Sequence, residues 1–268
     1  MSFILTNTLH LAISLLSVCA PQAAAQPDSI LVQIGQKTQL QEQLKGAWQL
    51  GSGTTQFASL PKGATAIAMM EDGYFTVAYF DEAGKKFIGT YGGTYTLQNG
   101  KLTQNLEYNT LDTAAVGTTH TLSYTLKNGQ LQLKGNKVQE TWAKADKISN
   151  SPLEGTWRIT GRAEEGGKVN PIHTTGTRKT LKILSGNRFQ WIAFDSGNKS
   201  FSGTGGGTYT AENGTYTEYI EFFSRDSSRV GASLSFNFEV KDGKWHHSGT
   251  SSTGKPINEV WERISTLK

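Results

Sequence analysis

Two side chains in the second half of the chain, Glu218 and His247, are of types that could bind a polar group or move a proton. Each lies in a stretch of alternating polar and apolar residues, and the alternation places both on the face that points toward a core. An ionised carboxylate in an apolar interior is costly unless it is paired. We therefore expect Glu218 to hydrogen bond to His247, directly or through one bound group, or to bond to Tyr209.

The same alternation turns a set of aromatic residues toward these two groups. Small-molecule sites are usually apolar with a few convergent polar groups. Two interpretations stay open, a ligand site with an aromatic wall and a purely structural pair in a filled interior. The candidate ligand-binding residues are Phe189, Trp191, Phe201, Tyr209, Glu218, Phe222, Phe236, Phe238, Trp245 and His247.

The residue pattern gives little support for a metal site, a haem site or a catalytic triad. His246 and His247 are adjacent on a strand and so face opposite sides, and no metal site is predicted. His247 or His173 could ligate a haem, but nothing in the sequence selects that group, and no cofactor is predicted. No Ser-His-Asp order is present, so Glu218 with His247 is the one plausible acid–base pair, and no catalytic residue is assigned.

The elements that position these residues occur twice in the chain. The segment from Gly89 to Thr96 returns almost unchanged from Gly203 to Thr210, a shift of 114 positions. The shift is 109 at the first Gly-x-Trp motif and 119 at the last Glu-x-Trp motif, so the second copy gained residues in two loops. This period is far longer than a solenoid repeat, and each copy should be a domain with its own core.

The first copy differs from the second at the candidate site. Gln104 and Leu133 stand at the positions that carry the carboxylate and the imidazole in the second copy. Gly205 of the second copy replaces Tyr91, which should empty space there. The comparison places the expected ligand site chiefly in the second copy.

Both copies contain short alternating stretches separated by Asn-Gly or Asp-Gly, the strongest short-range signal of a β-hairpin. About eight strands fit in each copy. The sequence predicts an all-β fold of two tandem up-and-down antiparallel β-barrels, with a β-sandwich as the alternative. The expected boundaries are residues 44–144 for barrel 1, 145–152 for a linker and 153–263 for barrel 2.

These motifs resemble the lipocalin-like, or calycin, proteins. The matching features are Gly-x-Trp in the first strand, the antiparallel meander and a basic residue after the last strand, Lys144 or Arg263. The resemblance implies that the first-strand Trp closes the barrel floor and that the basic residue packs across it. It is more specific in the second copy, which resembles a secreted bacterial lipocalin-like domain of uncharacterised function through Gly205 to Thr210, Tyr216 to Glu221, Trp245 to Gly249 and Glu259 to Arg263.

The N-terminal residues predict export. A short apolar run ends in Ala23-Ala24-Ala25, which is typical of a signal peptide over residues 1–25 cleaved before Gln26. The one cysteine, Cys19, lies in a segment that resembles a lipoprotein box, so lipid anchoring is the alternative. We expect a secreted or periplasmic protein with no transmembrane segment after cleavage.

The composition of the chain argues against nucleic acid as a partner. The formal net charge is +4 and the basic residues are scattered, which does not make a nucleic-acid footprint. The sequence favours an exported, non-enzymatic binding protein that holds a small hydrophobic or amphipathic molecule in a barrel cavity. The alternatives are a barrel enzyme of the isomerase or cyclase type that uses Glu218 and His247, and a structural or interaction module of the cell envelope with filled barrels.

Overall fold

A computed structural model of the 268-residue chain describes residues 42–264, apart from residues 58, 148, 165–167 and 173–174. The predicted signal peptide, Cys19 and His173 lie outside the described residues. Within the described ranges, no helix is long and apolar enough to cross a membrane.

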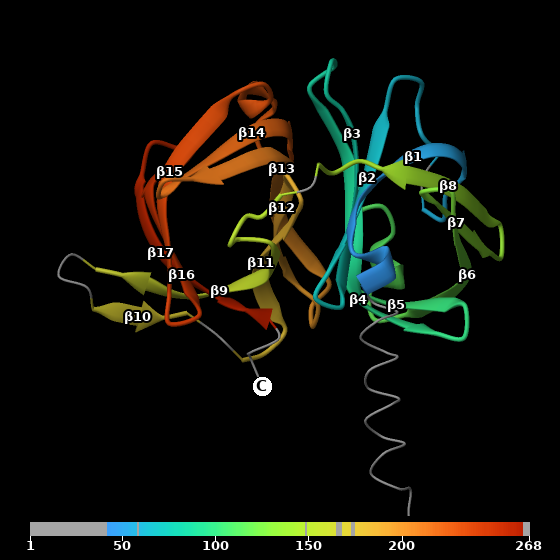
Figure 1. Cartoon of the computed structure of the whole chain (residues 1–268), viewed down its shortest axis with the longest axis horizontal. Coiled ribbons are helices and arrows are strands. Elements are labelled where there is room, and N and C mark those ends of the chain that lie inside the picture. The colour runs from blue at the N-terminus through green and yellow to red at the C-terminus, as the bar shows by residue number, and fades with distance from the viewer. Residues whose placement is uncertain (1–41, 58, 148, 165–167, 173–174, 265–268) are drawn as a thin grey trace, which may run out of the picture. The chain divides into compact units, whose positions relative to one another are not determined.

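The first barrel is a closed antiparallel meander in which each strand pairs with the next and β8 returns to β1 (Figure 1). Its eight strands are β1 (Gly46–Thr54), β2 (Thr65–Glu71), β3 (Tyr74–Asp81), β4 (Lys86–Gln98), β5 (Lys101–Asn109), β6 (Thr119–Lys127), β7 (Gln130–Gly135) and β8 (Val138–Lys144). A short 3-10 helix, η1 (Thr113–Ala115), lies between β5 and β6.

The second barrel repeats this order and closes through β17 and β9. Its strands are β9 (Gly155–Ala163), β11 (Arg178–Ser185), β12 (Arg188–Asp195), β13 (Ser200–Glu212), β14 (Thr215–Phe223), β15 (Ser233–Lys241), β16 (Lys244–Thr250) and β17 (Pro256–Arg263). An added strand, β10 (Val169–Pro171), pairs with the end of β9, and η2 (Ser227–Arg229) repeats η1. The predicted fold of two tandem antiparallel barrels is confirmed.

Each barrel is closed at one end by the tryptophan of its Gly-x-Trp motif. The Lys144 amine lies 4.4 Å from the ring centre of Trp48, and the Arg263 guanidinium lies 4.5 Å from that of Trp157. The glycine two residues before each tryptophan has a positive φ, and a Cβ there would collide with the same basic side chain. The motif therefore encodes a floor in which glycine makes room for a cation over an indole.

The outer faces of β2 to β5 and of β11 to β14 pack against each other and form a core between the barrels. Two aromatic pairs show the internal symmetry of this interface. Phe80 lies 4.8 Å from Phe222, and Tyr108 lies 4.8 Å from Phe194, where 80 and 194, like 108 and 222, are equivalent positions in the repeat. The two copies thus meet through the same surface, as subunits of a two-fold symmetric dimer do.

A polar pair lies within this interface. The hydroxyl of Thr76 donates to the amide oxygen of Gln190 at 2.8 Å. The amide nitrogen of Gln190 donates to the hydroxyls of Thr90 and Thr204 at 3.1 Å and 3.0 Å. Because Gln190 uses both ends of its amide, its burial leaves no polar group unsatisfied.

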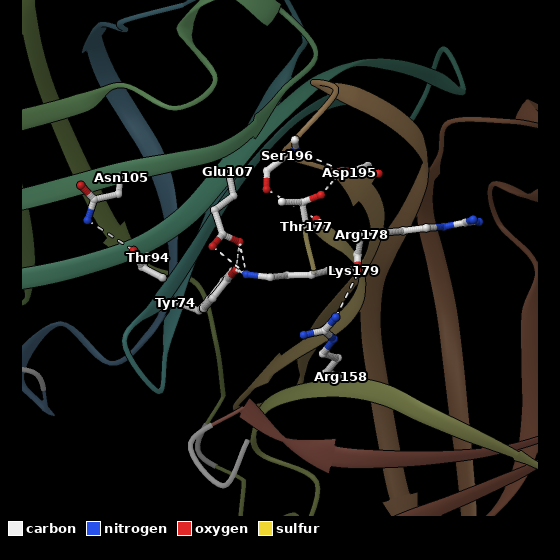
Figure 2. Close-up of polar contacts among 11 residues, drawn as sticks. Tyr74, Thr94, Asn105, Glu107, Arg158, Thr177, Arg178, Lys179, Asp195 and Ser196 are labelled. Atoms are coloured by element: carbon white, nitrogen blue, oxygen red, sulfur yellow. Dashed lines mark hydrogen bonds and ion pairs between the residues drawn. The ribbon is translucent and has the colours of Figure 1, made fainter. Parts of the chain in front are cut away.

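Ion pairs link the two barrels at the edge of the interface, among them Arg263 with Asp72 at 3.6 Å and Lys179 with Glu107. Lys179 of β11 donates to both carboxylate oxygens of Glu107 in β5, at 2.7 Å and 2.9 Å, and the Tyr74 hydroxyl bonds to the same carboxylate (Figure 2). The side chains of Lys179 and Glu107 are partly solvent-exposed, at the rim of the apolar interface, which is where a protein interface usually keeps its charges, whereas Tyr74 is buried.

Candidate functional site

A buried ion pair lies inside the second barrel. The Lys182 amine on β11 donates to Glu218 Oε1 on β14 at 2.8 Å, and the Tyr216 hydroxyl donates to the same oxygen at 3.0 Å. The side chains of Lys182 and Glu218 are 6% and 5% exposed, so water does not screen the pair. Each charge compensates the other, which is what a carboxylate in an apolar interior requires.

Aromatic rings surround the lysine amine. Its nitrogen lies 4.8 Å from the ring centre of Tyr216, 5.0 Å from Trp245, 5.6 Å from Trp261 and 5.7 Å from Phe236. A desolvated ammonium is attracted by the negative faces of such rings. The interior of the second barrel therefore holds an aromatic cage that its own lysine occupies.

His247 belongs to a second hydrogen-bonded pair inside the same barrel. Its Nδ1 lies 3.2 Å from Glu259 Oε2, which also accepts from the Trp261 indole at 3.2 Å. Burial, followed by the positive charge of Lys182, lowers the pKa of His247. The imidazole is therefore neutral at neutral pH, with its Nδ1 proton donated to Glu259.

Burial would raise the pKa of Glu259, but the hydrogen bond from His247, the positive charge of Lys182 and the hydrogen bond from Trp261 outweigh it, and the net shift is downward. The second ring nitrogen of His247 has no hydrogen-bond partner among the described residues. A histidine oriented by a carboxylate can act as a general base, but the His247 side chain is only 2% exposed.

The expected direct bond between Glu218 and His247 is wrong, and so is the alternative bond to Tyr209, whereas a bond through one bound group stays a prediction. Glu218 bonds to Lys182 and Tyr216, whereas His247 bonds to Glu259. Both groups do point into the barrel, so their faces were predicted correctly. The residue pattern did not identify their actual partners, Lys182 for Glu218 and Glu259 for His247.

The predicted aromatic residues divide into three groups. Phe189, Tyr209, Phe236 and Trp245 are buried in the core of the second barrel. Trp191 and Phe238 are half-buried and pack against that core. The structure does not test whether any of these residues contacts a ligand, so that remains a prediction.

The expected inward direction of Phe201 and Phe222 is wrong, because both lie in the interface between the barrels. A β-bulge changes which face of the strand each occupies. On β14, Ile220 pairs with Gly207 and Phe222 with Gly206, so Glu221 is the extra residue and the alternation reverses after it. A second bulge, at residue 202, does the same for Phe201.

Reversal of the alternation also places Phe223 inside the second barrel, whereas an unbroken alternation from Glu218 would turn it outward. Phe223 packs against Trp191, with ring centres 5.5 Å apart, and a Cβ added at Gly205 would lie 2.7 Å and 2.8 Å from these two side chains. The space that Gly205 was expected to leave is therefore filled.

The second barrel has an open groove at the end opposite its floor. A hollow of about 770 Å³ lies between the last part of β9, the first part of β17 and the turn before β17. Arg162 and Lys255 bring positive charges to it, and Ile257 brings apolar surface. Glu259 lines the same groove, so the carboxylate that binds His247 connects the groove with the buried interior.

The first barrel keeps one of these polar groups. Glu140 occupies the position of Glu259, and the Trp142 indole donates to it at 2.9 Å, as Trp261 does to Glu259. Burial raises the pKa of Glu140 to about 7. Glu140 and Gln104 line a small enclosed cavity of about 10 Å³.

Among the residues that the structure describes, no group of three or more His, Cys, Asp or Glu is placed to hold a metal ion. The fold and site define a tandem arrangement of β-barrels with a polar, aromatic interior in the second barrel. Residues 152–268 match the model of a family described as a domain of unknown function, DUF4488, and this match spans the second barrel. No curated protein matches the chain.

Proposed function

We propose that this chain is an exported binding module of the lipocalin-like kind, and that its ligand site is the open end of the second barrel. The groove of about 770 Å³ carries the proposal, because one of its walls is the carboxylate that orients the buried His247. The opposite end is closed by Trp157 and Arg263, so a ligand enters and leaves through the groove.

The groove favours an amphipathic ligand with an anionic group. Arg162 and Lys255 present positive charge, whereas Ala163, Pro256 and Ile257 present apolar surface. Arg162 stands where the first barrel has Gly53, so the charge is specific to the second barrel. The bound molecule lies above the filled lower interior, and Trp191 and Phe238 are the predicted aromatic residues that remain accessible from solvent.

Acid–base catalysis by Glu218 and His247 has less support. Glu218 is held by Lys182 and Tyr216, and His247 is buried behind Glu259. A general base must lie within hydrogen-bonding reach of the proton that it removes. Glu259 is a carboxylate that lines the groove, and a hydrogen bond from His247 favours its ionised form.

A fluorescence titration of the whole chain tests the proposal. The probes are 1-anilinonaphthalene-8-sulfonate, which is anionic and amphipathic, and N-phenyl-1-naphthylamine, which is neutral. The variant Arg162→Gln with Lys255→Gln should weaken binding of the anionic probe by about tenfold or more, since hydrogen bonds to charged groups contribute roughly 1.5–3 kcal/mol. It should affect the neutral probe less.

The control is Lys134→Gln, which removes an exposed charge from the first barrel. Equal affinities of wild type and the double variant for the anionic probe would contradict the proposed site. If a variant of the first barrel weakens binding and the double variant does not, the ligand site lies in the first barrel instead.

A further inference from the structure

The first barrel has no counterpart of the buried Lys182, but it keeps polar residues at the positions of the groups that surround the lysine amine in the second barrel. In the second barrel, Lys182 pairs with Trp157 across β9 and β11, and in the first barrel the equivalent pair is Ala68 with Trp48. The short side chain of Ala68 lines the enclosed cavity instead of filling it. A lysine of the second barrel thus stands at a position that borders a small cavity in the first.

The groups that receive this cation have equivalents around the cavity. Gln104 stands at the position of Glu218 and pairs with Tyr95 as Glu218 pairs with Tyr209. Glu140 stands at the position of Glu259 and pairs with Leu133 as Glu259 pairs with His247. An amine placed where Lys182 ends would meet an amide oxygen and lie close to a carboxylate.

Gln104 is a second polar residue in the wall of this cavity. Its side chain is 3% exposed and lines the cavity together with Glu140. A buried amide is favourable only when its polar atoms have hydrogen-bond partners, so a donor that enters the cavity would find an acceptor in Gln104.

Glu140 has no partner of opposite charge among the described residues around the cavity. The Trp142 indole and the backbone N–H of Gln56 bond to its carboxylate, and no basic side chain of the described residues pairs with it. The wall around it is otherwise apolar, with Leu122, Leu131 and Leu133 at the positions of Phe236, Trp245 and His247. A carboxylate in such surroundings is stabilised by a cation that enters the cavity.

We propose that the cavity of the first barrel is a binding site for a primary ammonium group, which takes the place that the Lys182 amine occupies in the second barrel. The cavity has about 10 Å³ of free space, close to the room that one water-sized group needs. Ammonium is of that size, and its N–H groups donate to Gln104 and Glu140. The proposal concerns a different barrel from the proposed amphipathic ligand and does not depend on it.

Thermal unfolding of the whole chain at pH 8 tests this site. Ammonium chloride should raise the unfolding temperature in a saturable way, beyond the effect of sodium chloride at the same ionic strength, because a ligand that binds only the folded state stabilises it. Tetramethylammonium, which is too large and donates no hydrogen bond, should act like sodium. With ¹⁵N-labelled ammonium, the bound ion should give a separate NMR signal whose protons are protected from exchange.

Two variants decide the location. Ala68→Lys copies the lysine of the second barrel into the cavity and should abolish the ammonium effect while keeping the fold. Glu140→Gln keeps the shape and the acceptor for Trp142, and should weaken ammonium binding about tenfold by removing the charge. If Ala68→Lys fails to fold, Glu140→Gln carries the test alone.

Equal effects of ammonium and sodium on the wild type would overturn the proposal, as would an ammonium effect that is undiminished in both variants. The chemical source of the amine follows from a further arm with n-butylammonium. A response to ammonium alone identifies the free ion, and a response that n-butylammonium shares identifies the amine end of a longer molecule.

Discussion

The two barrels share strand order, floor and mutual interface, yet their interiors differ. In the second barrel, the charge of Lys182 pairs with Glu218, and His247 hydrogen bonds to Glu259. In the first, Ala68 and Leu133 leave Glu140 without such a partner. The common element is a glutamate bonded to the indole two residues later. The comparison teaches that both closed barrels keep this glutamate–indole contact while the charges around it differ.

The largest expected effect comes from breaking the paired interior of the second barrel. Lys182→Met should lower the free energy of unfolding by about 3–5 kcal/mol, because it leaves Glu218 buried and ionised without a partner. Glu218→Gln should also destabilise, because the lysine then lacks its counter-ion. Urea denaturation of each variant measures the loss.

The double variant sharpens this result. Lys182→Met with Glu218→Gln removes both charges and should cost less than the sum of the single changes, since residues in contact are not additive. Additive free energies would show that the two side chains do not depend on each other.

A smaller effect concerns the unpaired glutamate of the first barrel. Burial raises the pKa of Glu140 from its ordinary value of 4.5 to about 7 in the folded protein, so the folded state binds more protons between these two pH values. Stability should therefore fall as pH rises from about 4.5 to 7, by up to about 3 kcal/mol from this group. Glu140→Gln should remove that part of the pH dependence.

Glu71, at the interface, provides the matched case, because burial raises its pKa to about 7 as well. Glu71→Gln should remove a comparable share of the slope. Chemical denaturation from pH 4.5 to pH 8 compares the wild type with both variants. A slope that neither variant changes would mean that other groups cause it.

The smallest effect is expected at the edge of the interface. Lys179→Ala removes the ion pair with Glu107, whose two side chains are 18% and 20% exposed. The loss should be about 0.2–1 kcal/mol and should shrink as salt is added, because surface pairs are screened. Denaturation at low and high salt checks both points, and a loss that is independent of salt would argue against a charge effect.

Much of the fold could be predicted from the sequence. The Asn-Gly and Asp-Gly turns marked the hairpins, and the Gly-x-Trp motifs with Lys144 and Arg263 indicated the floors. Residue faces were harder. A β-bulge leaves no clear mark in an alternating sequence, so the faces of Phe201, Phe222 and Phe223 were assigned to the wrong side.

Lys182 was missed for a different physical reason. In the segment that contains it, Leu181 and Ile183 are the apolar residues, and alternation alone assigns them to the barrel core. Both instead face the other barrel, so the charged residue between them points inward. A strand whose outer face is also buried therefore shows the opposite of the usual pattern. Glu259 could have been found, because it shares the face of the floor-side Trp261.

The contact between the barrels has a consequence for how the duplicated gene could diverge. Thr76 meets Gln190 and Glu71 meets Ser185, and in each case the two residues are equivalent positions, 114 apart. In a dimer of identical chains such positions face their own copies, so a buried glutamate would lie against a second glutamate. Fusion of the two copies into one chain permits unlike partners at the axis, here a donor opposite an acceptor. Once such pairs had formed, neither half could return to pairing with itself without losing them.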